Sequence, residues 1–338
     1  MQHAPLVEVT RGSETESIHY GSVAVVNARG ELLYQAGDPH FLTFTRSSLK
    51  PFQAVPFLRG GGPAKFGFTP GEIALMCASH SGESVHVETV RSMLQKAGCD
   101  ERHLRCGCHV PLQYSAFDRQ PPAGAVFDQL YNNCSGKHAG FLAYCVQQGQ
   151  ALETYLDPAH PLQQAVRKSV ADLAGVNETE LRMGIDGCSA PNYALPLSRL
   201  AALYARLAQG ADDTEYGDVL GGLYLAMTTH PELVSGTGRA DLELMRTAPG
   251  DWVAKGGAEG VQVIGVRSAG LGIALKVADG GKRGVQAATA SVLRQLGLLA
   301  RPEQSPLATW IRPPVVNLRG LHTGEVRAAV KLAKTTFG

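Results

Sequence analysis

The strongest constraint on the fold is the position of two kinds of hydrophobic periodicity along the chain. Strand-like runs lie near both ends and are joined in pairs by turn residues, at 22–26, 31–35, 261–266 and 271–277. Such pairs predict β-hairpins. Helical periodicity fills the middle of the chain, at 69–78, 84–97, 138–148, 161–173, 196–209 and, more weakly, 215–229. The economical arrangement is one antiparallel sheet of N- and C-terminal strands with a large helical insertion, an α/β fold of the α+β type.

The remaining segments fit this arrangement. Residues 280–299 predict a helix that covers the sheet, and residues 315–317 with a run near Val326 predict an edge strand. No linker rich in Pro, Gly or Ser divides the chain. We therefore expect a single compact unit, with a sheet region formed by 1–45 and 240–338 and a helical region formed by 46–239.

Composition excludes several function classes. The 338 residues carry 31 Lys and Arg against 30 Asp and Glu, a net charge of +1, so nucleic-acid and membrane partners are not expected. The N-terminal residues lack the pattern of a secretory signal, and no apolar run is long enough to span a membrane. Seven cysteines without such a signal indicate a reducing, cytoplasmic location.

Three short motifs carry residues suited to nucleophilic catalysis. Ser47 and Lys50 form an S-x-x-K pattern that places both side chains on one face of a helix. A serine hydroxyl needs a base to remove its proton, and a desolvated lysine is one such base. If a helix starts near Ser47, its hydroxyl lies at the positive helix end, and Pro56 should kink the helix. Taken alone, however, this motif is frequent by chance and is more often an ordinary helix cap followed by a lysine.

The other two motifs are Ser79-His-Ser81 and Lys255-Gly-Gly257, each of which alone is consistent with a loop. Together, the three motifs follow the order found in penicillin-recognising serine enzymes. Their convergence would unite Ser47, Ser79 and Lys255, and an oxyanion hole would use backbone N–H groups of Ser47 and of a residue near Gly257.

Longer segments extend this pattern, and with them the chain resembles the third class of L-asparaginases, the rhizobial type. That family is similar in fold to serine β-lactamases and glutaminases. The segments that carry the resemblance are RSSLKPFQ (46–53), ASHSGE (78–83), CGCH (106–109), NNCSGKH (132–138), GIDGCSAP (184–191), THPELVSGTGR (229–239) and KGGAEG (255–260).

The resemblance implies two Ser–Lys pairs, Ser47 with Lys50 and Ser79 with Lys255. It also implies a metal site at Cys134, Lys137 and Cys188, which we expect to hold one zinc ion. The residue types support only part of that site, because thiolates are good zinc ligands whereas lysine must first lose a proton. Without the resemblance, buried free thiols are the favoured interpretation of the two cysteines. We interpret Cys106 and Cys108 as loop thiols, because no second close pair completes a tetrahedral site.

The remaining candidates would bind substrate. Asp186 is a candidate partner for an α-ammonium group, although it could also be an exposed loop residue. Arg46 could pair with the α-carboxylate or fix Asp186, since guanidinium binds carboxylate through two hydrogen bonds. His138 could donate to substrate or to the metal shell.

We therefore expect a homodimeric L-asparagine amidohydrolase that releases aspartate and ammonia through a serine acyl-enzyme. Spacing does not decide which serine attacks; we favour Ser47 because of its position at the helix start. One alternative is a serine glutaminase or other β-lactamase-like amidase, because asparagine and glutamine differ by a single methylene. Another is an inactive sensor of amino acids or metal.

Overall fold

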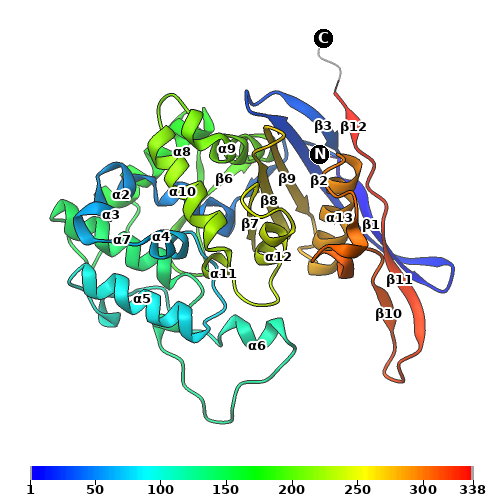
Figure 1. Cartoon of the computed structure of the whole chain (residues 1–338), viewed down its shortest axis with the longest axis horizontal. Helices are drawn as coiled ribbons and strands as arrows, with labels where there is room; N and C mark the ends of the chain where they lie inside the picture. The colour runs from blue at the N-terminus through cyan, green and yellow to red at the C-terminus, as the bar shows by residue number, and fades with distance from the viewer. Residues whose placement is uncertain (1, 336–338) are drawn as a thin grey trace. The chain divides into compact units, whose positions relative to one another are not determined.

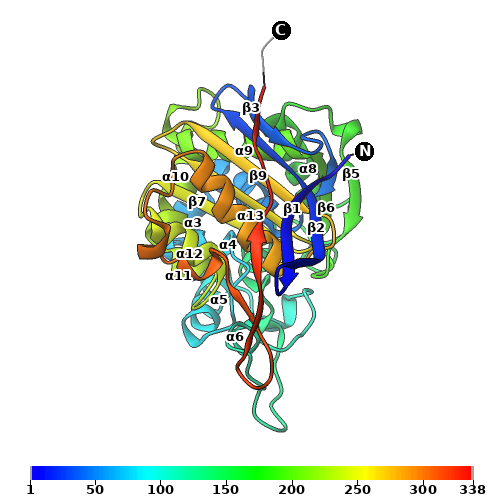
Figure 2. The same cartoon turned by 90° about the vertical axis from the view of Figure 1, so that its right-hand side faces the viewer.

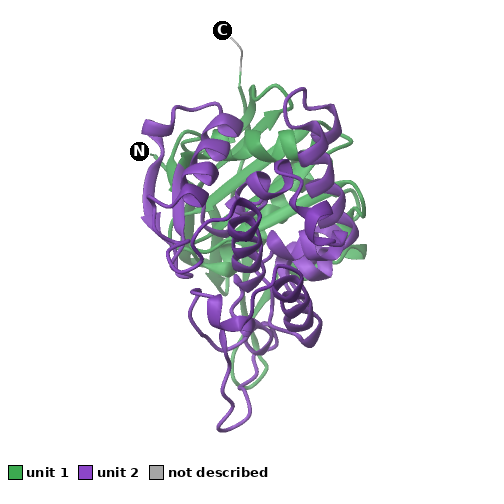
Figure 3. Ribbon diagram, turned by 90° about the vertical axis from the view of Figure 1, so that its left-hand side faces the viewer, with its two compact units in different colours: residues 1–43, 195–208, 246–338 green, residues 44–194, 209–245 purple. Residues whose placement is uncertain are grey.

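The computed structural model describes residues 2–335, which divide into two compact units. Unit 1 contains residues 1–43, 195–208 and 246–338, and unit 2 contains residues 44–194 and 209–245, as Figure 3 shows in two colours. The expectation of a single compact unit stays a prediction. No helix within residues 2–335 is long and apolar enough to cross a membrane.

Unit 1 is built on an antiparallel sheet whose strands come from both ends of the chain. The order β10-β11-β1-β2-β9-β8-β7 forms its main path, and β3 pairs with both β2 and β12. The nine described strands are β1 (Ala4–Arg11), β2 (Glu14–Asn27), β3 (Leu32–Ala36), β7 (Trp252–Gly257), β8 (Val261–Val266), β9 (Leu271–Val277), β10 (Pro314–Val316), β11 (His322–Ala328) and β12 (Ala333–Lys334).

The central pair joins the two ends of the sequence. Strand β2 runs antiparallel to β9, with Ala24 opposite Ala274 and Gly21 opposite Val277. The predicted α+β class, the two hairpins and the shared sheet of residues 21–35 and 261–277 are therefore confirmed. The predicted edge strand is also confirmed, as β10 and β11.

Two helices cover the faces of this sheet. Helix α9 (Leu197–Gln209) approaches β9 closely, because a Cβ at Gly272 would lie only 1.9 Å from Ala201 O. Helix α13 (Lys282–Gln295) covers the other face (Figures 1 and 2). Two short turns, η6 (Pro302–Gln304) and η7 (Ala308–Trp310), connect α13 to β10.

Unit 2 is mostly helical, as predicted for the middle of the chain. Its longer helices are α4 (Pro70–Met76), α5 (Ser84–Lys96), α7 (Ser135–Gln148), α8 (Pro161–Ala174) and α10 (Gly217–Thr229). Shorter helical segments are η1 (Arg46–Leu49), α1 (Lys50–Gln53), α2 (Val55–Arg59), α3 (Gly62–Phe66), η2 (Glu101–His103), α6 (Leu112–Ala116), η3 (Gln129–Tyr131), η4 (Glu178–Glu180), η5 (Gly210–Asp212), α11 (Pro231–Val234) and α12 (Ala240–Thr247), the last of which ends in unit 1.

Local sequence explains several of these helices. Thr69 and Glu72 form the predicted capping box at the start of α4, and Gly149 ends α7 with a φ of 64°. The predicted kink at Pro56 is a break: α1 ends at Gln53, and α2 begins at Val55 with proline in its first turn.

Strands β4 (Leu42–Phe44), β5 (Arg182–Ile185) and β6 (Pro191–Pro196) form a separate small sheet in the order β4-β6-β5. Cys188 falls within the region 46–239 that the sequence predicts to be mostly helical, but its neighbouring segments are strands. The residue lies in the tight turn between β5 and β6, which carry too few residues and too much glycine and proline to show strand periodicity.

Candidate active site

The segment around Ser47 begins with a strained backbone. Arg46 has a φ of 50°, which is unfavourable for a residue with a Cβ. The Asn192 amide clamps it: Asn192 Oδ1 accepts from Arg46 N at 3.0 Å, and Nδ2 donates to Arg46 O at 3.1 Å. Ser47 follows in η1, half-buried, and its hydroxyl makes no hydrogen bond to any residue between 2 and 335. The site therefore presents one serine hydroxyl that is not occupied by the protein itself.

Lys50 is fully buried and contacts the second serine motif. Its Nζ donates to Ala78 O at 2.5 Å and lies 3.0 Å from Ser79 Oγ. The lysine of the first motif thus bonds the serine of the second. The pairings of Ser47 with Lys50 and of Ser79 with Lys255 stay predictions.

The loop that carries Ser79 is held at each successive residue. Ser79 N donates to Val234 O at 3.0 Å, and His80 N donates to Asn133 O at 3.1 Å. His80 accepts from Gly82 N at Nδ1, so its Nε2 is the donor to Ser135 Oγ at 2.8 Å. Burial lowers the pKa of His80 well below its ordinary value, which keeps the ring neutral. A rigid loop therefore fixes the Ser79 hydroxyl beside the amine.

Arg46 also contacts Asp186, the predicted partner of a substrate α-ammonium group. Its Nε donates to Asp186 Oδ1 at 2.9 Å, and Gly187 N donates to the same oxygen at 2.8 Å. Only 10% of the Asp186 side chain is exposed, so this ion pair is largely shielded from water. Of the two roles that the sequence left open for Arg46, the geometry places it on Asp186.

The three predicted metal ligands gather at the start of α7 and the β5–β6 turn. Lys137 Nζ lies 3.0 Å from Cys188 Sγ, and all three side chains are buried. The hydrogen bond from Cys134 and the Lys137 charge lower the pKa of Cys188, whereas that bond and burial raise the pKa of Cys134. Burial opposes a charge on Lys137, but Cys188 and Cys134 outweigh it and raise the pKa of this lysine. The two sulfur atoms and the lysine nitrogen therefore form one buried cluster.

This cluster is consistent with zinc in its donor set. Two sulfur atoms and one amine could supply three ligands, which would leave a fourth position for water or substrate. Within residues 2–335, no group of three or more His, Cys, Asp or Glu side chains could hold a metal ion, so the third ligand would have to be Lys137. Cys106 is also buried, with its pKa raised to about 12 by burial and by the charge of Cys188, whereas Cys108 is exposed.

His138, which follows Lys137 on α7, has a polar partner that the sequence did not indicate. Its Nδ1 lies 2.6 Å from Tyr155 Oη, and Tyr155 Oη accepts from Arg105 N at 3.0 Å. The buried tyrosine hydroxyl needs an acceptor for its proton, and Nδ1 is the only one within hydrogen-bond distance among residues 2–335, so we assign the donor role to Tyr155 and the proton of His138 to Nε2. Nε2 is buried without a hydrogen-bond partner among residues 2–335. Burial lowers the pKa of His138, so the neutral ring offers one N–H donor.

Lys255 and Gly257 lie in unit 1, on β7, rather than in a loop. Lys255 is 1% exposed, and its Nζ donates to Gly256 O at 3.0 Å. Their convergence with Ser47 and Ser79 stays a prediction.

Sequence reasoning missed Asn192 and Tyr155. Neither residue belongs to a short motif that specifies chemistry, and each acts through a contact with a distant part of the chain. Asn192 lies only one position beyond the segment 184–191, but its function depends on a residue 146 positions away.

A serine hydroxyl beside a buried lysine is typical of hydrolases that act through a covalent intermediate. The family described as L-asparaginase II matches residues 7–328, and the chain belongs to this family. It is therefore a hydrolase of the class that acts on amides.

Other comparisons found weaker similarities. No protein with a curated description matches the chain. Among solved structures, the chain is 15% identical to Mglu in its native form, with a TM-score of 0.47 over 82% of this chain and 65% of Mglu. It is 15% identical to a β-lactamase from Mycobacterium bovis, with a TM-score of 0.42 over 81% and 94% of the two chains. It is 12% identical to simvastatin synthase from Aspergillus terreus, with a TM-score of 0.36 over 76% and 86%.

Proposed function

We propose that the protein hydrolyses the side-chain amide of L-asparagine to L-aspartate and ammonia through a serine acyl-enzyme. The observation that carries the proposal is the buried Lys50 amine, 3.0 Å from Ser79 Oγ and three residues after Ser47, whose hydroxyl has no partner among residues 2–335. Amide hydrolysis through an acyl-enzyme requires a hydroxyl that attacks the amide carbon and a base that accepts the hydroxyl proton.

In the proposed reaction, Ser47 Oγ attacks the carboxamide carbon while Lys50 Nζ accepts its proton as the general base. The tetrahedral oxyanion collapses, the C–N bond breaks, and Lys50 returns the proton to the leaving ammonia. Water then attacks the ester, with the same amine as base, and releases aspartate. Ser79 would relay protons to Lys50, and Lys255 with the Gly257 backbone would complete the oxyanion side of the site.

One observation favours a second assignment, in which Ser79 is the nucleophile. Ser79 rather than Ser47 forms the hydrogen bond to Lys50. The two assignments make opposite predictions for the acyl-enzyme, because only the attacking serine becomes esterified.

For substrate recognition, we propose that Asp186 binds the α-ammonium group and that Arg46 holds this carboxylate in place. The 2.9 Å ion pair supports the second role. The Nε2–H of His138 would donate to substrate or to the metal shell, since a buried donor without a partner requires an acceptor.

We further propose that Cys134, Lys137 and Cys188 hold one zinc ion. A bound zinc ion would act as a Lewis acid that polarises a substrate oxygen. The short contact between Lys137 and Cys188 supports a shared site.

The functional test measures ammonia release from L-asparagine beside L-glutamine and a β-lactam. Asparagine turnover supports the proposal, preferential turnover of glutamine or the β-lactam supports the alternative amidase, and no turnover supports the sensor. Ser47→Ala should reduce kcat on the order of 10⁶-fold, and Lys50→Met nearly as much. The exposed Ser115→Ala is the control.

The nucleophile is identified by mass spectrometry of acid-quenched enzyme and by trapping the acyl group with hydroxylamine. An aspartyl adduct on Ser47 supports the first assignment. If the adduct lies on Ser79, or if Ser47→Ala keeps more than about a tenth of the activity, the nucleophile is Ser79.

The zinc proposal is tested by elemental analysis of purified protein, in which we expect about one zinc per chain. The double variant Cys134→Ser, Cys188→Ser should lose it, whereas the variant Cys99→Ser, which removes a thiol outside the cluster, should keep it. Stoichiometric zinc in the double variant would exclude this site.

We also propose a cytoplasmic homodimer. The absence of a disulfide among the described cysteines supports a reducing compartment. Exposed apolar side chains at the β10–β11 hairpin support an interface between two chains.

A further inference from the structure

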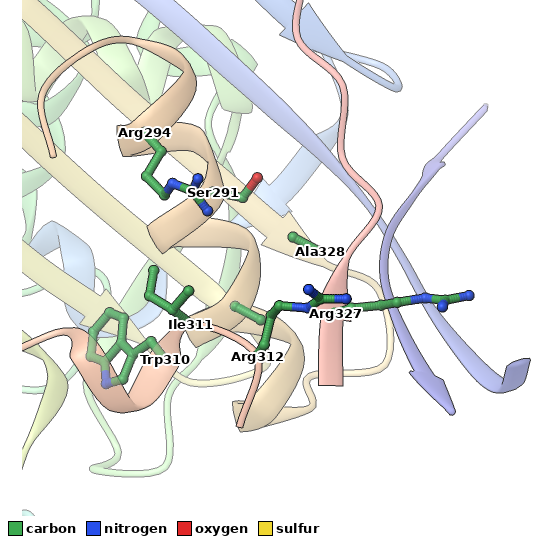
Figure 4. A pocket seen from close by; sticks show the side chains of 8 residues that line it. Ser291, Arg294, Trp310, Ile311, Arg312, Arg327 and Ala328 are labelled. Atoms are coloured by element: carbon green, nitrogen blue, oxygen red, sulfur yellow. The ribbon is translucent and has the colours of Figure 1, made fainter. Parts of the chain in front are cut away.

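Unit 1 contains a pocket that none of the catalytic motifs uses. It has a volume of about 220 Å³ and is enclosed by α13, by the segment after η7 and by β11. Figure 4 shows Ser291 and Arg294 on the helix above Trp310 and Ile311. Arg312 and Arg327 complete the lining. The pocket therefore combines an apolar wall with the Arg294 guanidinium, whereas the Arg327 side chain extends away from it (Figure 4).

The charges of these arginines do not cancel. Arg312 pairs with Glu325 at 2.8 Å, and Arg327 pairs with Glu8 at 2.8 Å. Within residues 2–335, Arg294 forms no ion pair or side-chain hydrogen bond. Arg294 therefore carries a positive charge that no carboxylate among residues 2–335 neutralises, and a single monoanion would neutralise it.

The backbone at Arg312 is held in an unfavourable conformation. Its φ is 51°, which is unfavourable for a residue with a Cβ, and the proline that follows restricts its backbone further. Backbone strain of this kind costs on the order of 1–3 kcal/mol and persists where the surrounding structure fixes a side chain in place. Here it fixes one guanidinium at the rim of the pocket.

We propose that this pocket binds a small monocarboxylate with a planar apolar body. The Arg294 guanidinium matches a carboxylate through two parallel hydrogen bonds, and the Ser291 hydroxyl is a further donor on the same helix. Trp310, which is only 6% exposed, and Ile311 form the apolar wall for the body of the ligand. The volume admits a substituted aromatic ring but not a dinucleotide. This proposal does not depend on asparagine hydrolysis.

The tryptophans provide the measurement. The chain has two, Trp252 and Trp310, and only Trp310 lines the pocket. The probe is 4-bromobenzoate, whose heavy atom quenches a tryptophan that it contacts. We expect saturable quenching by the wild-type protein, and none by its neutral analogue 4-bromobenzyl alcohol at the same concentrations. The variant Trp310→Phe should lose the saturable signal.

Arg294→Gln should weaken binding of the probe by about ten-fold or more, because it removes the charge-assisted hydrogen bonds. Since Arg294 is exposed, this variant should keep its thermal stability. The matched control is Arg319→Gln, an exposed arginine outside the pocket, which should bind like the wild type. Isothermal titration calorimetry with benzoate checks each affinity without fluorescence.

Three results would overturn the proposal. They are quenching that rises linearly with the probe, saturable quenching that survives Trp310→Phe, and an affinity that is unchanged in Arg294→Gln. Inorganic phosphate provides a further arm. If phosphate displaces the probe at equal or lower concentration, the pocket is a plain anion site and the proposed ligand class is wrong.

Discussion

At the residue scale, one hydrogen bond decides what His138 can do. Tyr155 is fully buried, and its hydroxyl donates to Nδ1 at 2.6 Å, so the ring carries its proton on Nε2. Without this donor, the neutral ring could move its proton to Nδ1 and lose the N–H at Nε2. We therefore assign Tyr155 as a positioning residue that acts through His138.

Tyr155→Phe keeps the ring in place and removes only the hydroxyl. We expect kcat to fall about 10- to 100-fold because the hydrogen bond to the His138 ring is lost, and the free energy of unfolding to fall by about 1–3 kcal/mol because Nδ1 and Arg105 N lose their partner. Nitrogen-15 NMR of the histidines should show His138 shift from the Nε2–H form towards a mixture. The control is Tyr144→Phe, which lies on α7 with His138 and should leave both measurements unchanged. An unaltered tautomer in Tyr155→Phe would contradict the assignment.

At the element scale, the contact between α4 and α7 positions the two halves of the candidate site. Helix α4 leads into the Ser79 loop, and α7 begins beside Cys134 and carries Lys137. The two helices approach closely at Gly136, where an added Cβ would lie 2.3 Å from Leu75 O. Any side chain at this position would push against the backbone rather than against a flexible side chain.

Gly136→Ala should therefore destabilise the protein by about 1–3 kcal/mol, as overpacked cores do. Gly222→Ala is the matched control, because this α10 glycine has nothing within 4 Å of an added Cβ. It should stabilise the protein by about 0.5–1 kcal/mol through helix propensity. Urea unfolding measures both free energies, and equal effects of the two substitutions would contradict the role of the close contact.

The capping box of α4 gives a pH-dependent prediction. Burial opposes the charge on Glu72, but hydrogen bonds from Lys96, Thr69 N and Ser92 outweigh it and lower its pKa below 4.5. A carboxyl group whose pKa is lower in the folded state stabilises above its unfolded pKa, and this stabilisation is lost as the pH falls.

Glu72→Gln should therefore reduce the free energy of unfolding by about 1–3 kcal/mol at pH 7 and by less at about pH 3.5. Glu88→Gln, at an exposed position of α5, is the control and should have little effect at either pH. Urea unfolding at the two pH values provides the comparison. A cost that is constant with pH would show that the charge of Glu72 does not contribute.

The strands of unit 1 differ in how far their sequences predict them. Residues 261–266 and 271–277 are continuous β-rich runs around a turn, and they form β8 and β9 with the predicted bounds. Strand β7 was missed because Trp252–Gly257 contains a lysine and two glycines, which give no strand periodicity. Its extended conformation depends on pairing with β8, and the residues of β7 themselves do not predict this pairing.

The candidate site was predictable where the residue type limits the chemistry. Serine, lysine and cysteine in short motifs point to a nucleophile, a base and a metal ligand, and the structure brings Lys50 to Ser79 and Lys137 to Cys188. Asn192 and Tyr155 were not predictable, because they act through their positions relative to distant residues. A short motif therefore indicates candidate reacting groups but not the residues that hold them in place.

At the scale of the whole molecule, three exposed apolar side chains lie on the β10–β11 hairpin of unit 1. Val316, Leu318 and Leu321 are 51%, 109% and 52% exposed. Figure 1 shows this hairpin extending beyond α13. Large apolar side chains that cluster at a projecting hairpin are typical of a surface that another protein covers.

We predict that this hairpin contributes to the homodimer interface. Light scattering after size exclusion should give twice the 35.8 kDa chain mass for the wild type and one chain mass for the double variant Leu318→Asp, Leu321→Asp. Two buried carboxylates would carry a large desolvation cost in an interface, whereas the free chain keeps them hydrated.

Val126→Asp is the control, because Val126 is 91% exposed in a separate loop of unit 2, and this variant should stay dimeric. A wild-type monomer, or a double variant that stays dimeric, would place the interface elsewhere or exclude it. If the double variant is a monomer and keeps its asparagine turnover, each chain holds a complete site. If turnover is lost although the monomer stays folded, the dimer is required for activity.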